Sequence, residues 1–235
     1  MRLIKSLFLL LFFSLTLIAC QKKIENTMTV SGAIDGLKKG TLYLQKTNDS
    51  SLVTIDSIEI KGDGVFSFSY EIENPELFYL YLDKADNNDI NDRITFFGEE
   101  GEIVINTTWN TFDRNSEITG SKSHEKYAEF QGMLSKFNTR DLELAQLIMV
   151  QKNEVSQEKM DSIEKLSQNN ILRRYQYIIN FGLTNPESYV TPYVALVEAQ
   201  DANPKYLDSI HSVLSVEVAN SKYGKALKSY IQSLK

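Results

Sequence analysis

The apolar residues of this chain change their spacing near residue 120, and that change limits the folds the chain can adopt. Between residues 28 and 120, apolar and polar residues alternate in short runs that turn residues separate. Between residues 121 and 235, apolar residues recur every three or four positions. Alternation is typical of half-buried strands, and the longer spacing is typical of amphipathic helices. The sequence therefore predicts an α+β fold, an N-terminal antiparallel β-sandwich or barrel-like sheet (28–120) followed by an α-helical region (121–235).

The β-rich part is divided by turns into short strands. A turn with two glycines, Lys61-Gly62-Asp63-Gly64, separates two alternating runs, which predicts a β-hairpin between residues 53–60 and 65–70. Asp63, Glu99 and Glu100 are expected to be solvated turn residues. The strands are expected at residues 28–34, 41–45, 53–60, 65–70, 77–82, 93–97 and 102–108.

The helical region is divided by polar and proline-containing breaks. A first helix should follow residue 121, and Ser156 resembles the start of a second helix. That second helix should run to about Phe181, with Gly182 beyond it as a stop. Further starts are expected at the Asn-Pro pairs 185–186 and 203–204 and after Ser221.

The N-terminal residues predict where the protein goes. Two cationic residues precede an apolar run that ends at Ile18, and this run is shorter than the roughly 20 residues that a membrane-spanning helix needs. Leu17-Ile18-Ala19-Cys20 is similar to the lipobox that the lipoprotein signal peptidase reads. The similarity implies that residues 1–19 are a cleaved signal peptide, that Cys20 is lipidated, and that residues 20–27 are a short tether. A plain secretory signal with a chance cysteine is the alternative.

The expected anchor and the net charge limit the partners. The stretch Gln21-Lys22-Lys23 lacks the acidic residues that follow the cysteine of some surface-exported lipoproteins, which favours the periplasmic face of the outer membrane. The net charge of −6 becomes −8 when Arg2 and Lys5 leave with the signal peptide. Nucleic acid is not an expected partner, because its binding needs clustered cations that neutralise phosphates.

Residues that support catalysis or metal binding are few. Cys20 is the only cysteine, so its lipidation would exclude disulfides, Cys-x-x-Cys sites and thiol nucleophiles. His124 and His211 are the only histidines, and neither has a cluster of metal-binding residues around it in the sequence. No Ser-His-Asp set is recognisable either. We therefore expect no cofactor, no metal and no enzymatic activity.

Three segments are candidate binding sites that each have a structural alternative. The loop Asp86–Asp92 is rich in the oxygen ligands that Ca²⁺ prefers, but it lacks the glycine and closing glutamate of an EF-hand, and Asp/Asn runs also form ordinary solvated turns. The aromatic strand Phe78–Tyr81 could line a sugar or peptide groove, although such strands more often pack on both faces. Tyr175, Tyr177 and Ile178 could face a partner, although packing against the sheet explains them first.

The β-rich part contains a series of short motifs in a fixed order: Thr29–Gly32, Gly40–Leu44, Asp56-Ser57, Gly64–Phe68, Pro75, Phe96-Phe97 ahead of Gly101-Glu102-Ile103, and Ile118–Ser121. This series resembles a known family, the domain of unknown function DUF4369. The resemblance covers roughly Met28 to Phe130.

The resemblance also carries expectations about the rest of the chain. In that family the domain often precedes a thioredoxin-like domain, in envelope lipoproteins of Gram-negative bacteria of the Bacteroidetes type. The helical part resembles the linker region of those proteins. The thioredoxin-like domain itself, with its Trp-Cys-x-x-Cys site, is expected to be missing, since Trp109 lies in the β-rich part with no cysteine beside it.

The expected function follows from these features taken together. We predict a membrane-anchored envelope lipoprotein that acts as a non-catalytic binding or scaffold module, with the membrane and an envelope protein as partners. One alternative is an accessory module of a thioredoxin-like redox system, which without a thiol could only bind or position other proteins. Another alternative is a lipoprotein that binds a small ligand or a glycan.

Overall fold

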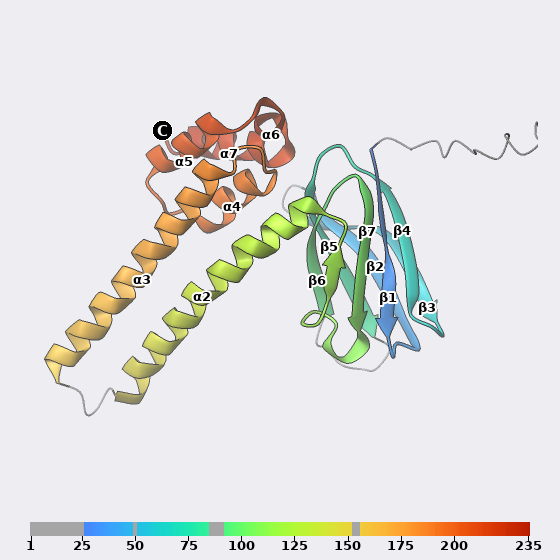
Figure 1. Ribbon diagram of the computed structural model, residues 1–235, viewed down its shortest axis with the longest axis horizontal. Helices are drawn as coiled ribbons and strands as arrows, with labels where there is room; N and C mark the ends of the chain where they lie inside the picture. The colour runs from blue at the N-terminus through green and yellow to red at the C-terminus, as the bar shows by residue number, and fades with distance from the viewer. Residues whose placement is uncertain (1–25, 49–50, 85–91, 152–155) are drawn as a thin grey trace, which may run out of the picture.

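The computed structural model describes residues 26–48, 51–84, 92–151 and 156–235. Two four-stranded sheets form its N-terminal part, and helices form the remainder (Figure 1). The expected α+β architecture is confirmed in its sandwich form, because the described strands make two separate sheets and no closed barrel.

The two sheets enclose an apolar core. One sheet has the strand order β4-β1-β7-β8 and the other has the order β3-β2-β5-β6. The aromatic members of the core between them are Phe66, Phe68, Phe78, Phe96 and Phe112. Successive side chains of a strand point to opposite faces, so alternation places the four rings that belong to strands inside, while Phe112 enters the core from the turn after β7. The strands are β1 (Thr27–Asp35), β2 (Lys39–Asn48), β3 (Ser51–Lys61), β4 (Val65–Glu71), β5 (Glu76–Lys84), β6 (Asp92–Gly98), β7 (Gly101–Thr108) and β8 (Glu117–Thr119), with a 3₁₀ turn at Trp109–Thr111.

One strand pair departs from the expected antiparallel arrangement. β1 and β7 are parallel, with Met28 opposite Gly101 and Asp35 opposite Thr108. A parallel pair needs a long connection, and five other strands lie between β1 and β7 in the sequence. The two backbones are close at Gly32, where a Cβ atom would collide with the carbonyl group of Ile105.

The expected hairpin between the third and fourth strands is wrong. β3 pairs with β2 in one sheet, whereas β4 pairs with β1 in the other. The two-glycine turn carries the chain across the sandwich: the amide of Ile34 donates to the carbonyl oxygen of Gly64 at 3.0 Å, and the amide of Gly62 donates to that of Lys38 at 3.1 Å. Gly64 has a φ of 74°, a region that glycine adopts without strain.

The helices divide into a long hairpin and a compact group. α2 (Lys122–Gln151) and α3 (Gln157–Thr184) form the hairpin, which projects away from the sandwich (Figure 1). α4 (Val190–Glu198), α5 (Pro204–Val213), α6 (Val216–Asn220) and α7 (Lys222–Ser233) pack near the base of α3. Within the described part of the chain, no helix combines the length and the hydrophobicity needed to cross a bilayer.

Two expected helix boundaries are wrong, and the other expected helix starts are confirmed, including those of α2 at Lys122 and α3 at Gln157. Gly182 lies inside α3, where it is buried against Ile210, and the helix ends at Thr184 with Asn185 as its C-cap. The Asn185-Pro186 pair therefore ends one helix, and α4 begins only at Val190. The starts of α5 and α7 are confirmed, because Asn203 and Ser221 accept hydrogen bonds from backbone amides as N-caps.

The distal part of the hairpin, residues 133–151 and 157–175, is called the arm. Its two helices meet along positions spaced by three and four residues, the pattern of a coiled coil. One layer of this seam is polar: Asn170 Nδ2 donates to Asp141 Oδ1 at 2.7 Å and to the carbonyl oxygen of Phe137 at 2.9 Å. The seam positions, all buried or half-buried, are Leu134, Phe137, Asp141, Leu144 and Ile148 of α2 and Met160, Ile163, Ser167, Asn170 and Arg174 of α3.

A second apolar core joins the sandwich to the helices. Leu77 of β5 and Phe97 of β6 point out of the sandwich and are buried among helical residues. Their helical neighbours in this core include Phe130, Ile178, Phe181, Val194, Leu227 and Ile231. Tyr177 and Ile178, which were expected to pack against the sheet, belong to this core.

Candidate functional site

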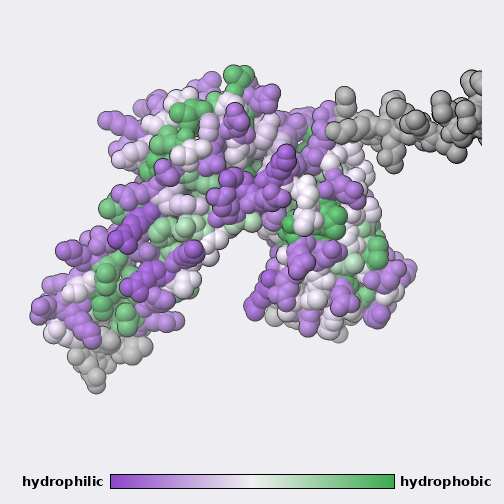
Figure 2. Space-filling model, viewed as in Figure 1, coloured by the Kyte–Doolittle hydropathy of each residue, from purple (hydrophilic) through white to green (hydrophobic). Residues whose placement is uncertain are grey.

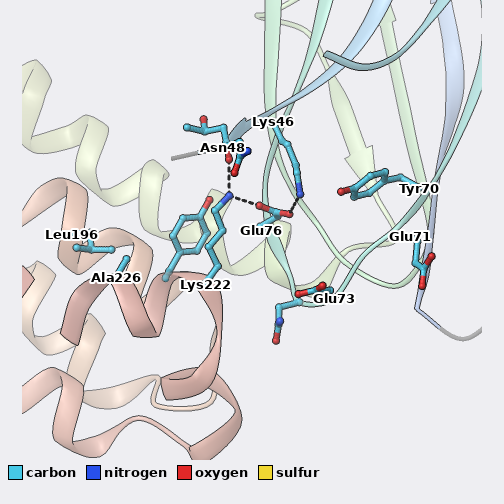
Figure 3. Close-up of a pocket in the computed structure, with 12 residues that line it drawn as sticks. Lys46, Asn48, Tyr70, Glu71, Glu73, Glu76, Leu196, Lys222 and Ala226 are labelled. Carbon is cyan, nitrogen blue, oxygen red and sulfur yellow. Dashed lines mark hydrogen bonds and ion pairs between the residues drawn. The ribbon is translucent and has the colours of Figure 1, made fainter. Parts of the chain in front are cut away.

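A cavity of about 950 Å³ opens where the sandwich meets α7 (Figure 3). The ends of β2 and β4, the connection to β5 and the start of β5 form one side, and α4 and α7 form the other. The cavity is lined by Lys46, Thr47, Asn48, Tyr70, Glu71, Glu73, Asn74, Glu76, Leu196, Lys222, Tyr223 and Ala226.

Glu76 is the central charged group of this junction. It is only 7% exposed, and it lies between two lysines that point toward it from different elements (Figure 3). Lys46 Nζ is 2.8 Å from Glu76 Oε1, and Lys222 Nζ is 2.5 Å from Glu76 Oε2. Lys222 also donates to the carbonyl oxygen of Thr47 at 2.7 Å. A single carboxylate therefore connects β2, β5 and the first turn of α7.

Lys46 is held in its charged form. Burial lowers its pKa, but the hydrogen bonds to Glu76 and Tyr70 outweigh this effect and leave the pKa above its ordinary value. The ammonium group also lies over the ring of Tyr70, 5.1 Å from its centroid. The cavity wall therefore keeps a fixed cation beside a buried anion.

A neutral hydrogen bond joins the same elements. The hydroxyl oxygen of Tyr223, in α7, accepts from the amide of Leu77 at 3.2 Å. The ring of Tyr223 lies 5.1 Å from that of Tyr193 and 6.1 Å from that of Phe97. Burial raises the pKa of both Tyr193 and Tyr223, so their hydroxyl groups stay protonated. These phenols serve the junction as neutral hydrogen-bonding groups.

The charged groups at the centre of the cavity are paired with one another. Its central lysines and carboxylate neutralise one another, and amide and carboxylate side chains form its rim. Across the described ranges, no group of three or more His, Cys, Asp and Glu residues is placed to hold a metal ion. The arrangement fixes the helical part on the sandwich, and further polar side chains line the cavity.

Both histidines lie in helices. His124 is in the first turn of α2, where its Nδ1 accepts from the amide of Phe97 at 3.4 Å, and His211 is in α5. Burial lowers the pKa of His124, which favours the neutral ring that this hydrogen bond needs.

Stability should therefore depend on the charge of His124. Because its pKa is lower in the folded chain, the unfolded chain takes up the proton first as the pH falls, and the contribution is complete only above about pH 6.5. His124→Gln should reduce the fall of the urea midpoint between pH 7.5 and pH 5. Superimposable pH profiles for the parent and the variant would contradict this assignment.

Some sequence candidates are outside the described residues. They are the signal peptide, the lipidation site Cys20 and the candidate calcium loop Asp86–Asp92, of which only the backbone of Asp92 is described. Asp63 is a turn residue as expected, with its carboxylate accepting from the amide of Val65 at 3.2 Å.

Glu99 has a role that the sequence reading missed. It was expected to be a solvated turn residue, but its carboxylate accepts from the amides of Lys122 and Ser123 at 2.6 and 3.2 Å and from the Ser123 hydroxyl at 2.5 Å. An anion favours the N-terminus of a helix, where amides lack partners. Glu99 therefore fixes the start of α2 on the β6–β7 turn.

The aromatic strand β5 is occupied on both faces. Phe78 belongs to the sandwich core, and Tyr79 is partly buried against the second core. Tyr81 stacks on Tyr43 at 5.7 Å, and the guanidinium of Arg93 lies 5.7 and 5.4 Å from the rings of Tyr79 and Tyr81. The strand therefore uses its rings in packing, the structural alternative that the sequence left open.

Comparison with known proteins identifies the β-rich part. Residues 28–127 match the model of a family described as a domain of unknown function, DUF4369, which confirms the resemblance seen in the motifs. The match includes all eight described strands and the first turns of α2 as far as Tyr127, the residue whose ring meets Phe97 at 5.8 Å. Searches of curated proteins and of solved structures found no match.

Proposed function

We propose that this chain is a membrane-anchored envelope lipoprotein that acts as a non-catalytic binding or scaffold module. The arm is the observation that supports the proposal best. It projects from the junction and carries apolar side chains that are exposed, visible as green atoms among purple in Figure 2. Apolar surface surrounded by polar residues marks interaction sites on soluble proteins. The large exposed apolar residues of the arm are Met133, Leu142, Leu147, Met149, Leu166, Ile171 and Leu172.

The junction supports this role mechanically. A projecting arm can position a partner only if its base is fixed, because loose attachment costs ordering entropy on binding. Here the base is held by the second core, by the cap that Glu99 provides and by the ion pairs of Glu76. Lys46, Lys222 and the hydroxyl group of Tyr223 all bind within the junction itself. Such internal contacts suit a scaffold.

The proposed location of the protein rests on the N-terminal sequence. The lipobox-like residues Leu17–Cys20 support a lipid on Cys20, and the tether would hold the protein on a membrane, with the periplasmic face of the outer membrane as the proposed site. Membrane lipid and an envelope protein are then the partners.

A Cys20→Ser variant tests the anchor. The parent should fractionate with membranes, whereas the variant should be released or remain as an unprocessed precursor. If the variant were cleaved normally and still fractionated with membranes, lipid anchoring through Cys20 would be wrong.

A separate experiment tests the binding role. Cross-linking at the membrane, followed by purification of the chain, should recover a protein partner. A thermal-shift screen with sugars, peptides and calcium distinguishes the small-ligand alternative, because a ligand that binds the native state raises the melting temperature. A shift with one of these and no cross-linked partner would favour that alternative over the scaffold.

A further inference from the structure

The arm carries more apolar residues than a two-helix hairpin uses. Leu147 and Leu166 directly precede seam positions Ile148 and Ser167, and Ala145 and Ile171 directly follow seam positions Leu144 and Asn170. All four flanking residues are exposed. A two-stranded coil needs apolar residues only along its seam, whereas helices that face the core of a larger bundle are apolar at a flanking position as well.

Toward the tip of the arm, two apolar side chains of α2 are largely exposed. Leu142 is 65% exposed, and Met149, one heptad later on the same face of α2, is 78% exposed. Among the described elements, those that contact α2 and α3 lie at the base of the hairpin (Figure 1). Within the described ranges of the chain, these exposed apolar residues of the arm are therefore left without a partner.

We propose that the arms of two copies of this chain pair side by side into a four-helix bundle. The proposal rests on the binding role given above and names its partner as a second copy. In such a bundle the face of each hairpin that carries Ala145 and Ile171 becomes interior, because helices that face a bundle core are apolar at one flanking position as well as along the seam. Leu142 and Met149 lie three and four residues from Ala145 on the same face of α2. With a two-fold axis parallel to the arms, the same surface of each copy contacts its counterpart on the other copy, which is the usual geometry of a homodimer.

The distribution of charge favours a copy of the chain as the partner. The arm contains six basic and five acidic residues, in a chain whose net charge is −6. The remainder of each molecule is therefore acidic and repels its counterpart, while the arm is nearly neutral. Surfaces with a net charge near zero associate most readily. A strongly charged partner would find little complementary charge on the arm.

The position of the first described residues also favours pairing. β1 begins beside Gly101, at the end of the sandwich where Gly120 leads into α2, and the tip of the arm lies at the far end of the molecule (Figure 1). In copies held to one membrane through the segment before β1, the attachment would lie at the opposite end of the molecule from the tip of the arm, so it would leave the arms free to lie side by side.

Sedimentation equilibrium of the full chain in density-matched detergent tests the proposal at micromolar concentrations. The parent should be a dimer, and Leu142→Glu or Met149→Glu should weaken the dissociation constant at least tenfold, because a charge would be buried in the bundle. The matched control is Val216→Glu, since Val216 on α6 is also 78% exposed but lies outside the arm, and this variant should dimerise like the parent.

Cross-linking in intact membranes gives a second measurement that disrupts no packing. Leu142→Cys should form a disulfide or bis-maleimide dimer that the parent, with only Cys20, does not form. A monomeric parent, or arm variants that dimerise as tightly as the parent with unchanged helical circular dichroism, would overturn the proposal. Cross-links from position 142 to another protein alone would also overturn it. Neither outcome would affect the anchoring result, which Cys20→Ser decides separately.

Discussion

Phe97→Ala is expected to lower the free energy of unfolding by about 3–5 kcal/mol, the usual cost of removing a fully buried aromatic ring. Phe97 has no exposed surface, although it lies at the edge of the sandwich. Its ring is 5.7 Å from that of Tyr193 and 5.8 Å from that of Tyr127, both of them helical residues. The lost packing is therefore packing between the sandwich and the helices, and the two parts should become less tightly coupled.

Two optical probes can detect this loss of coupling. Trp109 is the only tryptophan and lies just after β7, so its fluorescence reports the sandwich, while circular dichroism at 222 nm reports mainly the helices. The two urea transitions should coincide in the parent and separate in Phe97→Ala. Phe97→Leu should cost less, because it keeps most of the apolar volume. A loss below about 1 kcal/mol with coincident transitions would contradict the role of Phe97 as the link.

The strands could be predicted from the sequence, but their sheet partners could not. Alternation is a local signal, so residues 53–60 and 65–70 were located within a few positions of β3 and β4. A tight glycine turn between two alternating runs is equally compatible with a hairpin and with a crossing between sheets. The hydrogen bond from Ile34 to Gly64 decides in favour of the crossing, and it depends on a strand far away in the sequence.

The helix boundaries show the same limit. Asn203 and Ser221 mark true helix starts, because an N-cap side chain accepts hydrogen bonds from amides only two or three residues away. Gly182 resembles a stop by itself, but the missing side chain serves a contact with Ile210 in another helix. A glycine that makes room for packing cannot be told from a glycine that ends a helix without knowing what lies opposite.

The junction was not predictable for a related reason. Glu76 and Lys222 are 146 positions apart, and no local pattern in the sequence links one to the other. Phe97 did occur in the family motifs, but its pairing with Tyr127 and Tyr193 depends on how the helices return to the sheet.

Glu76→Gln is expected to destabilise the chain by about 2–4 kcal/mol, because it leaves two cations facing a neutral group. This expected loss is slightly smaller than is usual when one partner of a buried ion pair is removed. The reason is that Lys46 and Lys222 are partly exposed and can turn toward water. Urea unfolding at pH 7 measures the loss. The matched control is Glu73→Gln in the same cavity wall, which is exposed and should stay within about 0.5 kcal/mol of the parent.

A double-mutant cycle assigns the effect to the ion pairs themselves. Lys222→Met alone should cost less than Glu76→Gln, because Glu76 keeps Lys46 at 2.8 Å as its partner. The two substitutions together should cost at least about 1 kcal/mol less than their sum, since neighbouring charges in one network are not additive. Additive costs would mean that Glu76 stabilises the junction through packing and not through charge. Because Glu76 is buried, the coupling should also persist in high salt, which screens mainly exposed charges.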